Sequence, residues 1–183
     1  MQTKFNKLKT QLDHIQNELL GFNVEFYDEA RFKSYINEHL DSLIISFQSV
    51  NITGYFSEGF AKIVLKCPEQ ANKIRLITQR LNPKRSSNDR KNLESLRRLQ
   101  DVGAEIRVNQ RVHCRMLLCR EREHKGLLIL GSFDFNKEGM NEERRDAGIY
   151  TTHPDLIESA FTYFNKMWDD KYDTKPLNEL YPS

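Results

Sequence analysis

Residues 112–136, VHCRMLLCREREHKGLLILGSFDFN, place polar groups inside the most hydrophobic part of the chain. Two apolar runs, each long enough for one β-strand, flank a short charged segment. Successive side chains of a strand point to opposite faces, so His113 and Arg115 are expected on one face, about 7 Å apart. By the same parity, Ser132 and Asp134 are expected side by side on the second strand.

Pairing of these two strands would bring all four polar groups to one end of a sheet. Two basic groups can reach one phosphate together, and Gly131 allows a close approach of the backbone to whatever lies there. The pattern therefore favours a phosphate-handling site. Residue types alone leave a second interpretation open, in which His113 is a hydrogen-bonded structural residue.

The rest of the chain alternates between helical and extended periodicity. Leu, Ile and Phe recur at three- and four-residue intervals in several segments, and β-branched residues cluster in others. Asp28 is expected to cap the second helix, and Leu156, Ile157, Ala160, Phe164, Met167 and Trp168 are expected to form the inward face of the last. The alternation predicts an α/β fold, a mixed β-sheet flanked by helices on both faces. Helices are expected over residues 3–20, 28–40, 58–67, 89–101 and from Pro154, and strands over 49–54, 73–78, 104–108, 112–118, 126–133 and 147–152.

The length of 183 residues predicts a single domain over 1–183, with an amphipathic helix in 1–22 and a C-terminal tail over 169–183. The longest apolar stretch, 126–131, is too short to cross a bilayer, and the first residues lack the pattern of a secretory signal, so a cytoplasmic location is expected. Cys114 and Cys119 have a spacing that zinc sites can use, but no second Cys/His pair follows at a suitable distance. Reduced thiols, no metal and no cofactor are expected.

The net charge of +2 hides an uneven distribution. Residues 80–125 carry 13 Lys/Arg against 6 Asp/Glu, a net charge of +7, which leaves −5 for the remainder. Such a segment attracts anions, and phosphate-backbone contact with DNA or RNA is the predicted use; a solvated surface is the alternative. The cations proposed for nucleic-acid binding lie in or beside the flexible segment 82–90: Arg80, Lys84, Arg85, Arg90 and Lys91.

The order of the polar residues resembles the signature of the phospholipase D superfamily. That signature is H-x-K, an Asp after four intervening residues, G-S-x-N, and an acidic residue before the last strand. The resemblance covers roughly Ser49 to Trp168 and implies a phospholipase D-like fold. The matching positions are His113-Cys114-Arg115, Arg120, Gly131-Ser132-Phe133-Asp134 and Asp146.

The resemblance implies a metal-independent phosphodiesterase with His113 as nucleophile and a phosphohistidine intermediate. Asp146 would orient the imidazole, and Arg115 and Ser132 would hold phosphate oxygens. Asp134, in place of Asn, would repel a phosphodiester unless an arginine neutralises it or it takes up a proton. Members of the family with one motif form homodimers that complete the site, so a homodimer is expected.

Two functions are consistent with this sequence. The first is a homodimeric nuclease or phosphodiesterase of the phospholipase D type. The second is a catalytically degenerate module that binds nucleic acid or a protein partner without cleavage. A purely structural dimer is a third possibility. A membrane partner is not expected, because no segment combines a basic helical face with Trp or Phe anchors; the N-terminal amphipathic helix is the one weak candidate for a lipid surface, and a core or dimer contact is its more common use.

Overall fold

The computed structural model describes residues 24–56, 58–121, 126–132 and 146–182. Within them the chain forms one eight-stranded mixed sheet with the strand order β1-β7-β6-β5-β2-β3-β4-β8. The predicted helix over 3–20 lies outside the described residues. In chain order the elements are β1 (Val24–Asp28), α2 (Glu29–Ser46), β2 (Ser49–Gly54), α3 (Glu58–Val64), a 3₁₀ turn η1 (Pro68–Lys73), β3 (Ile74–Thr78), α4 (Ser87–Asp101), β4 (Glu105–Asn109), β5 (Arg115–Arg120), β6 (Gly126–Gly131), β7 (Ala147–Thr151), α5 (Pro154–Trp168), β8 (Thr174–Pro176) and α6 (Leu177–Leu180).

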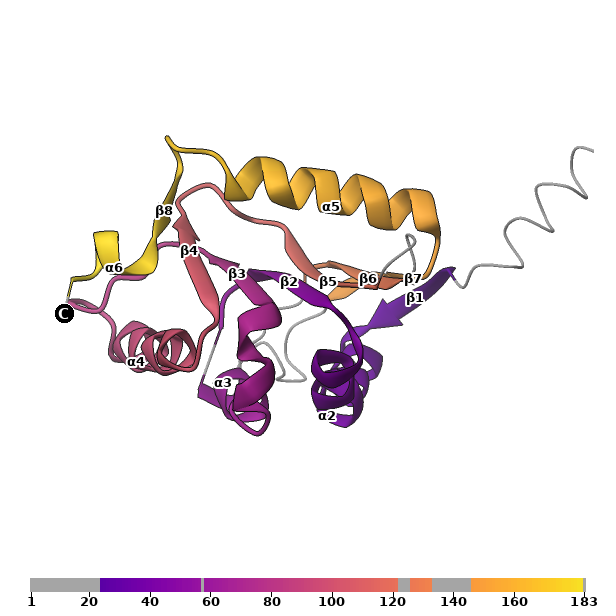
Figure 1. Ribbon diagram of the computed structural model, residues 1–183, viewed down its shortest axis with the longest axis horizontal. Helices are drawn as coiled ribbons and strands as arrows, with labels where there is room; N and C mark the ends of the chain where they lie inside the picture. The colour runs from indigo at the N-terminus through magenta and orange to yellow at the C-terminus, as the bar shows by residue number, and fades with distance from the viewer. Residues whose placement is uncertain (1–23, 57, 122–125, 133–145, 183) are drawn as a thin grey trace, which may run out of the picture.

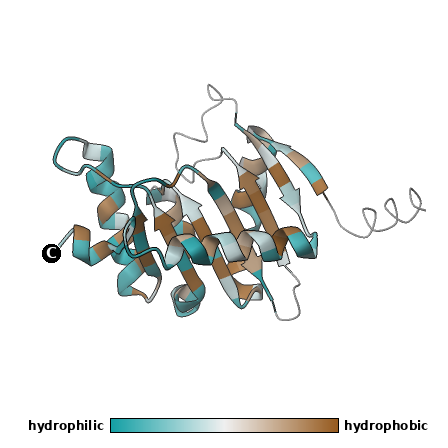
Figure 2. Cartoon of the chain, turned by 90° about the horizontal axis from the view of Figure 1, so that it is seen from above, coloured by the Kyte–Doolittle hydropathy of each residue, from teal (hydrophilic) through white to brown (hydrophobic). Residues whose placement is uncertain are grey.

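Helices cover both faces of the sheet, as predicted. Figure 1 shows α5 along one face and α2, α3 and α4 along the other. Strands β2, β3 and β4 run parallel and are joined through α3 and α4, whereas the remaining neighbours are antiparallel. Figure 2 shows hydrophobic residues concentrated on the strands in the middle of the sheet. The two apolar faces of these strands each require a helical layer to cover them.

Strand β5 shows how one segment serves both cores. Met116 and Leu118 pack in the cluster under α5, whereas Leu117 and Cys119 pack in the cluster formed with α2, α3 and α4. All four are buried. The alternation follows from the two-residue period of a strand and explains why the sequence is apolar at every position here.

Helix α2 begins where predicted but ends later. Asp28 caps it by accepting a hydrogen bond from the backbone N–H of Arg31 at 2.9 Å. The helix continues to Ser46 because Leu43 and Ile44 extend its buried stripe beyond Leu40. These two residues start a run that also suits a strand, and for this reason the sequence alone placed the helix end too early.

Helix α5 is fixed to its face by both apolar and cationic contacts. Ile157, Phe164 and Trp168 are buried, whereas Leu156, expected to face inward, is 42% exposed. The guanidinium carbon of Arg75 lies 5.1 Å from the centroid of the Phe164 ring, and its Nη2 donates to Asn165 Oδ1 at 3.0 Å. The helix is therefore turned so that Ile157, not Leu156, lies over the sheet.

Two strands that the sequence did not reveal extend the sheet at its edges. β1 pairs with β7 through five residues, and β8 pairs with β4 through three. Residues 169–183, predicted as a tail, thus contain β8 and α6. In the described part of the chain, no helix is both long enough and apolar enough to cross a membrane.

Candidate functional site

The strand register brings the ends of several strands to one side of the sheet, called here the site edge. β5 starts there with Arg115, directly opposite Gly131, the last residue of β6. The ends of β2 and β3 lie at the same side, because Thr53 pairs with Met116 and Gly54 pairs with Thr78. The two strands that carry the predicted motif are therefore neighbours, and their polar ends meet.

Ser132 and Asp146 are joined at the site edge. Ser132 Oγ donates to Asp146 Oδ1 at 2.8 Å and accepts from the backbone N–H of Ala147 at 3.2 Å. The other carboxylate oxygen, Asp146 Oδ2, is buried and has no hydrogen-bond partner among the described residues. A buried carboxylate oxygen is costly to leave unsatisfied, so this atom is available to a donor such as an imidazole N–H.

His113 precedes β5 instead of lying on it, which corrects the shared-face expectation for His113 and Arg115. The hydroxyl of Thr53, which is fully buried, donates to the carbonyl oxygen of Cys114 at 2.7 Å. This side-chain contact holds the backbone between His113 and Arg115 against the end of β2. It lies just before Arg115, the first residue of β5 that pairs with a neighbouring strand. His113 is exposed to solvent and Arg115 is half-buried.

The predicted basic residues lie in the β3–α4 loop, residues 79–86, and in the first turns of α4. The loop leaves β3 at Thr78, on the site edge. Two hydrogen bonds hold its backbone: the N–H of Asn82 donates to Asp89 Oδ2, and the N–H of Leu81 donates to the hydroxyl of Tyr181. The five cations, called here the basic cluster, are all exposed: Arg80, Lys84, Arg85, Arg90 and Lys91.

Comparison with known proteins identifies the family. Residues 37–168, well over half of the chain, match the family model described as "Cardiolipin synthase, PLD-like domain". The chain belongs to the phospholipase D-like family. This match agrees with the motif order and with the neighbouring placement of β5 and β6.

Solved structures share the fold of this phospholipase D-like domain. Nuc of Salmonella typhimurium, a phospholipase D family member, matches with a TM-score of 0.61 at 13% identity, covering 85% of this chain and 97% of Nuc. NucT of Helicobacter pylori matches with a TM-score of 0.57 at 16% identity over 81% and 96% of the two chains. The archaeal chromatin protein TrmBL2 matches with a TM-score of 0.53 at 13% identity over 92% and 60%. Among curated proteins, none matches significantly.

This phospholipase D-like domain departs from the family motif at Arg120, and the structure shows what the arginine does. Arg120 is the last residue of β5, five residues from Arg115 and about 17 Å along the strand. Its Nη2 donates to Glu158 Oε2 at 2.9 Å, and its guanidinium carbon lies 3.8 Å from the centroid of the Phe161 ring. Arg120 therefore attaches α5 and does not reach the site edge. Asp134, which stands in place of Asn, lies outside the described residues, and its role stays a prediction.

The thiols and carboxylates of the described residues form no metal centre. No group of three His, Cys, Asp or Glu within the described ranges is arranged to hold an ion. Cys114 and Cys119, whose spacing suggested zinc, pack in clusters on opposite faces of the sheet. Burial raises the pKa of both thiols. They are therefore poor ligands in this arrangement.

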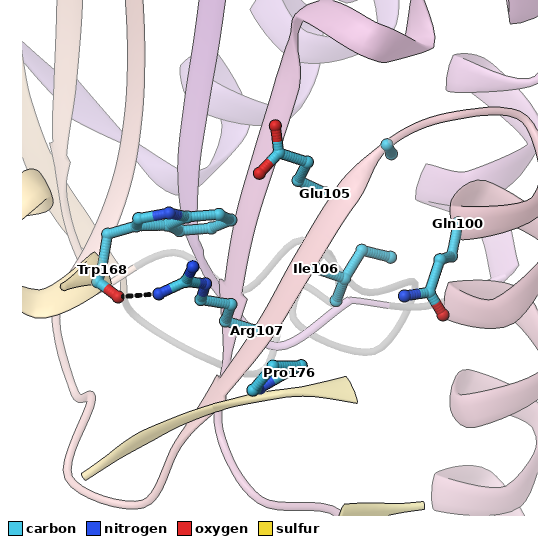
Figure 3. A pocket seen from close by; sticks show the side chains of 7 residues that line it. Gln100, Glu105, Ile106, Arg107, Trp168 and Pro176 are labelled. Carbon is cyan, nitrogen blue, oxygen red and sulfur yellow. Dashed lines mark hydrogen bonds between the residues drawn. The ribbon is translucent and has the colours of Figure 1, made fainter. Parts of the chain in front are cut away.

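A hollow of about 250 Å³ lies beside β4 and contains none of the predicted site residues. Figure 3 shows Arg107 next to Trp168, with its guanidinium bonded to the backbone oxygen of Trp168. Its guanidinium carbon is 4.5 Å from the centroid of the indole ring. The same contacts attach the end of α5 to β4. The hollow is lined by Gln100, Ala104, Glu105, Ile106, Arg107, Trp168 and Pro176.

Proposed function

We propose that this chain is a phosphodiesterase of the phospholipase D type that cleaves nucleic acid. The observation that carries the proposal is the meeting, at one sheet edge, of Arg115 at the start of β5 and the Ser132–Asp146 pair at the end of β6. His113 precedes Arg115 by two residues and is open to solvent. A nucleophile, a cation and an orienting carboxylate are the groups that covalent phosphoryl transfer uses.

The proposed reaction has two steps at phosphorus. In the first, an unprotonated nitrogen of His113 attacks phosphorus, the bond to the leaving oxygen breaks, and a phosphohistidine forms. In the second, water attacks the same phosphorus, and the bond to nitrogen breaks. Asp146 Oδ2 would accept the other imidazole N–H and keep the ring oriented, while Arg115 balances the charge on the phosphate oxygens. Ser132 can turn its proton from Asp146 to a phosphate oxygen.

A homodimer is part of the proposal because the leaving oxygen needs a proton. The chain has one copy of the motif, and one histidine cannot serve as nucleophile and acid in the same step. His113 of the partner subunit would supply the proton across a two-fold axis, and would take a proton back from the attacking water in the second step. The mechanism uses only side chains and water, so cleavage is expected without a divalent metal ion.

Nucleic acid is the proposed substrate because of the basic cluster. Its five exposed cations follow a strand that ends at the site edge, so a phosphate backbone can contact the cluster while one of its phosphodiesters lies at His113. The use of Arg120 as a packing residue favours a second candidate. In that case the motif has lost catalysis, and the domain binds nucleic acid without cutting it.

Labelled DNA and RNA incubated in EDTA test the proposal and separate the two candidates. The protein is compared with His113→Ala and with His39→Gln, which changes a half-exposed histidine on α2. Cleavage by the wild type and His39→Gln, but not by His113→Ala, supports the enzyme. Salt-sensitive binding without cleavage supports the binding module. Neither binding nor cleavage would contradict both.

A further inference from the structure

We propose that Tyr181 and Asp89 are positioning residues that hold the β3–α4 loop at the site edge, so that the basic cluster meets the phosphate backbone in a fixed geometry. The inference rests on the proposed function. It gives two residues outside the phospholipase D motif a role in nucleic-acid binding. Neither would touch the substrate. Both act on the backbone of the loop that carries three of the five cations.

Tyr181 binds the loop through both backbone polar groups of Leu81. Its hydroxyl donates to the backbone oxygen of Leu81 at 2.8 Å and accepts from the backbone N–H of Leu81 at 2.7 Å. Leu81 lies between Arg80 and the tip of the loop and is itself buried. Burial raises the pKa of Tyr181, so its hydroxyl keeps the proton that it donates. The phenol therefore replaces the pairing that a strand would give this backbone.

Asp89 ties the same loop to the end of β2. Its Oδ2 accepts from the backbone N–H of Asn82 at 2.6 Å, and its Oδ1 accepts from the hydroxyl of Tyr55 at 2.6 Å. Tyr55 directly follows Gly54, the last residue of β2 at the site edge. The backbone N–H of Asp89 also donates to Ser86 Oγ, the cap of α4. One carboxylate thus connects the loop, α4 and the central sheet.

The segment that supplies Tyr181 is itself anchored. Arg97 of α4 donates from Nη2 to the backbone oxygens of Tyr181 at 3.1 Å and Pro182 at 3.0 Å. Leu177 at the start of α6 is buried. The loop is therefore held from two sides, by the C-terminal segment and by β2.

A fixed loop matters for binding because ordering a flexible one costs conformational entropy when the partner arrives. The anchored backbone atoms lie at Leu81 and Asn82, while the side chains of the neighbouring cations Arg80, Lys84 and Arg85 are exposed. Charges held in this way can meet phosphates at a set spacing. A loop released from Tyr181 would keep its charge and lose the spacing.

Tyr181→Phe tests the inference without changing charge or ring size. Tyr172→Phe is the matched control, because Tyr172 is 93% exposed. Affinity for a short DNA duplex is measured over a range of salt concentrations. We expect weaker binding by Tyr181→Phe and a salt slope shallower by about 1, the loss of one phosphate contact. The same affinity and slope as the wild type would overturn the inference.

Asp89→Asn supplies a second test, because an electrostatic role and a positioning role of Asp89 predict opposite changes in DNA affinity. Removing a negative charge beside five cations tightens DNA binding if Asp89 acts only through its field. The amide cannot accept both bonds that the carboxylate accepts, so a positioning role predicts weaker binding. Faster amide exchange at Leu81 or Asn82 should accompany it in both variants. Tighter binding by Asp89→Asn would contradict the positioning role.

The two proposals can fail separately. A wild type that binds and cleaves DNA, with Tyr181→Phe and Asp89→Asn indistinguishable from it, retains the proposed function and overturns only the role of the two residues. A wild type that neither binds nor cleaves nucleic acid overturns both.

Discussion

Replacing Lys84 and Arg85 by glutamine removes two of the five exposed cations of the basic cluster and leaves the anchors of the loop in place. Each phosphate contact releases counterions, so the logarithm of the binding constant falls with the logarithm of salt with a slope of about −0.9 per contact. With five contacts, a rise from about 50 to about 200 mM salt weakens binding about 500-fold. With three, the same rise weakens it about 40-fold.

Fluorescence anisotropy with a labelled duplex at four or five salt concentrations gives the two slopes. The control is Lys66→Gln with Lys166→Gln, which removes two exposed charges, one after α3 and one on α5, away from the basic cluster. We expect a slope shallower by about 1.8 for Lys84→Gln with Arg85→Gln and an unchanged slope for the control. Equal slopes for the wild type and the Lys84/Arg85 variant would refute the placement of the nucleic acid along this loop.

Three further predictions concern the fold that supports the site. Phe164 is fully buried and stacks on Trp168, so Phe164→Ala leaves a cavity under α5. Urea titrations should show a loss of about 3–5 kcal/mol in the free energy of unfolding. A loss under about 1 kcal/mol would contradict the packing of α5. In Gly126→Ala the new Cβ would collide with the backbone oxygen of Cys119. The same assay should show a loss of about 1–3 kcal/mol in the free energy of unfolding. An unchanged urea midpoint would contradict the β5–β6 register. Because burial raises the pKa of the Cys119 thiol, a thiol reagent at pH 8 should label it only after unfolding; mass mapping of fast labelling in the folded protein would refute its burial.

The sequence predicted the central strands well because their residues carry signals that do not depend on distant parts of the chain. The apolar run before Gly131 and the β-branched residues of 49–54 have few alternatives to a buried strand. The sequence left the pairing of the two motif strands as a condition, and the structure meets it, because β5 pairs with β6. Local pattern and family resemblance agreed on these elements, and the structure confirms them.

The features that the sequence did not reveal depend on partners far away in the chain. β8 has only three residues and depends on its pairing with β4. The Nδ2 of Asn109 on β4 also donates to Thr174 Oγ1 at 2.7 Å. The start of β5 at Arg115 depends on a hydroxyl of β2, and the anchoring of the β3–α4 loop depends on Tyr181, one hundred positions after Leu81. The hydrophobic period of a sequence does not reveal such contacts, because each is a hydrogen bond between isolated polar groups that are distant in the chain.

The placement of His113 could be predicted only in part. The strand parity that gave His113 and Arg115 one face does not apply to His113, because β5 begins only at Arg115. Thr53, which fixes the backbone between them, carries no signal of its own beyond a place in an apolar strand. The exposure of His113 is consistent with a nucleophile that must reach a large substrate.

If His113 attacks phosphorus, a covalent phosphohistidine forms during cleavage and can be trapped. The protein is mixed in EDTA with an oligonucleotide, quenched at neutral or alkaline pH to preserve a phosphoramidate, digested and examined by mass spectrometry. We expect the peptide containing His113 to carry the nucleotide fragment, and we expect the adduct to be absent in His113→Ala. Cleavage with no adduct at His113, or with an adduct on another residue, would contradict it.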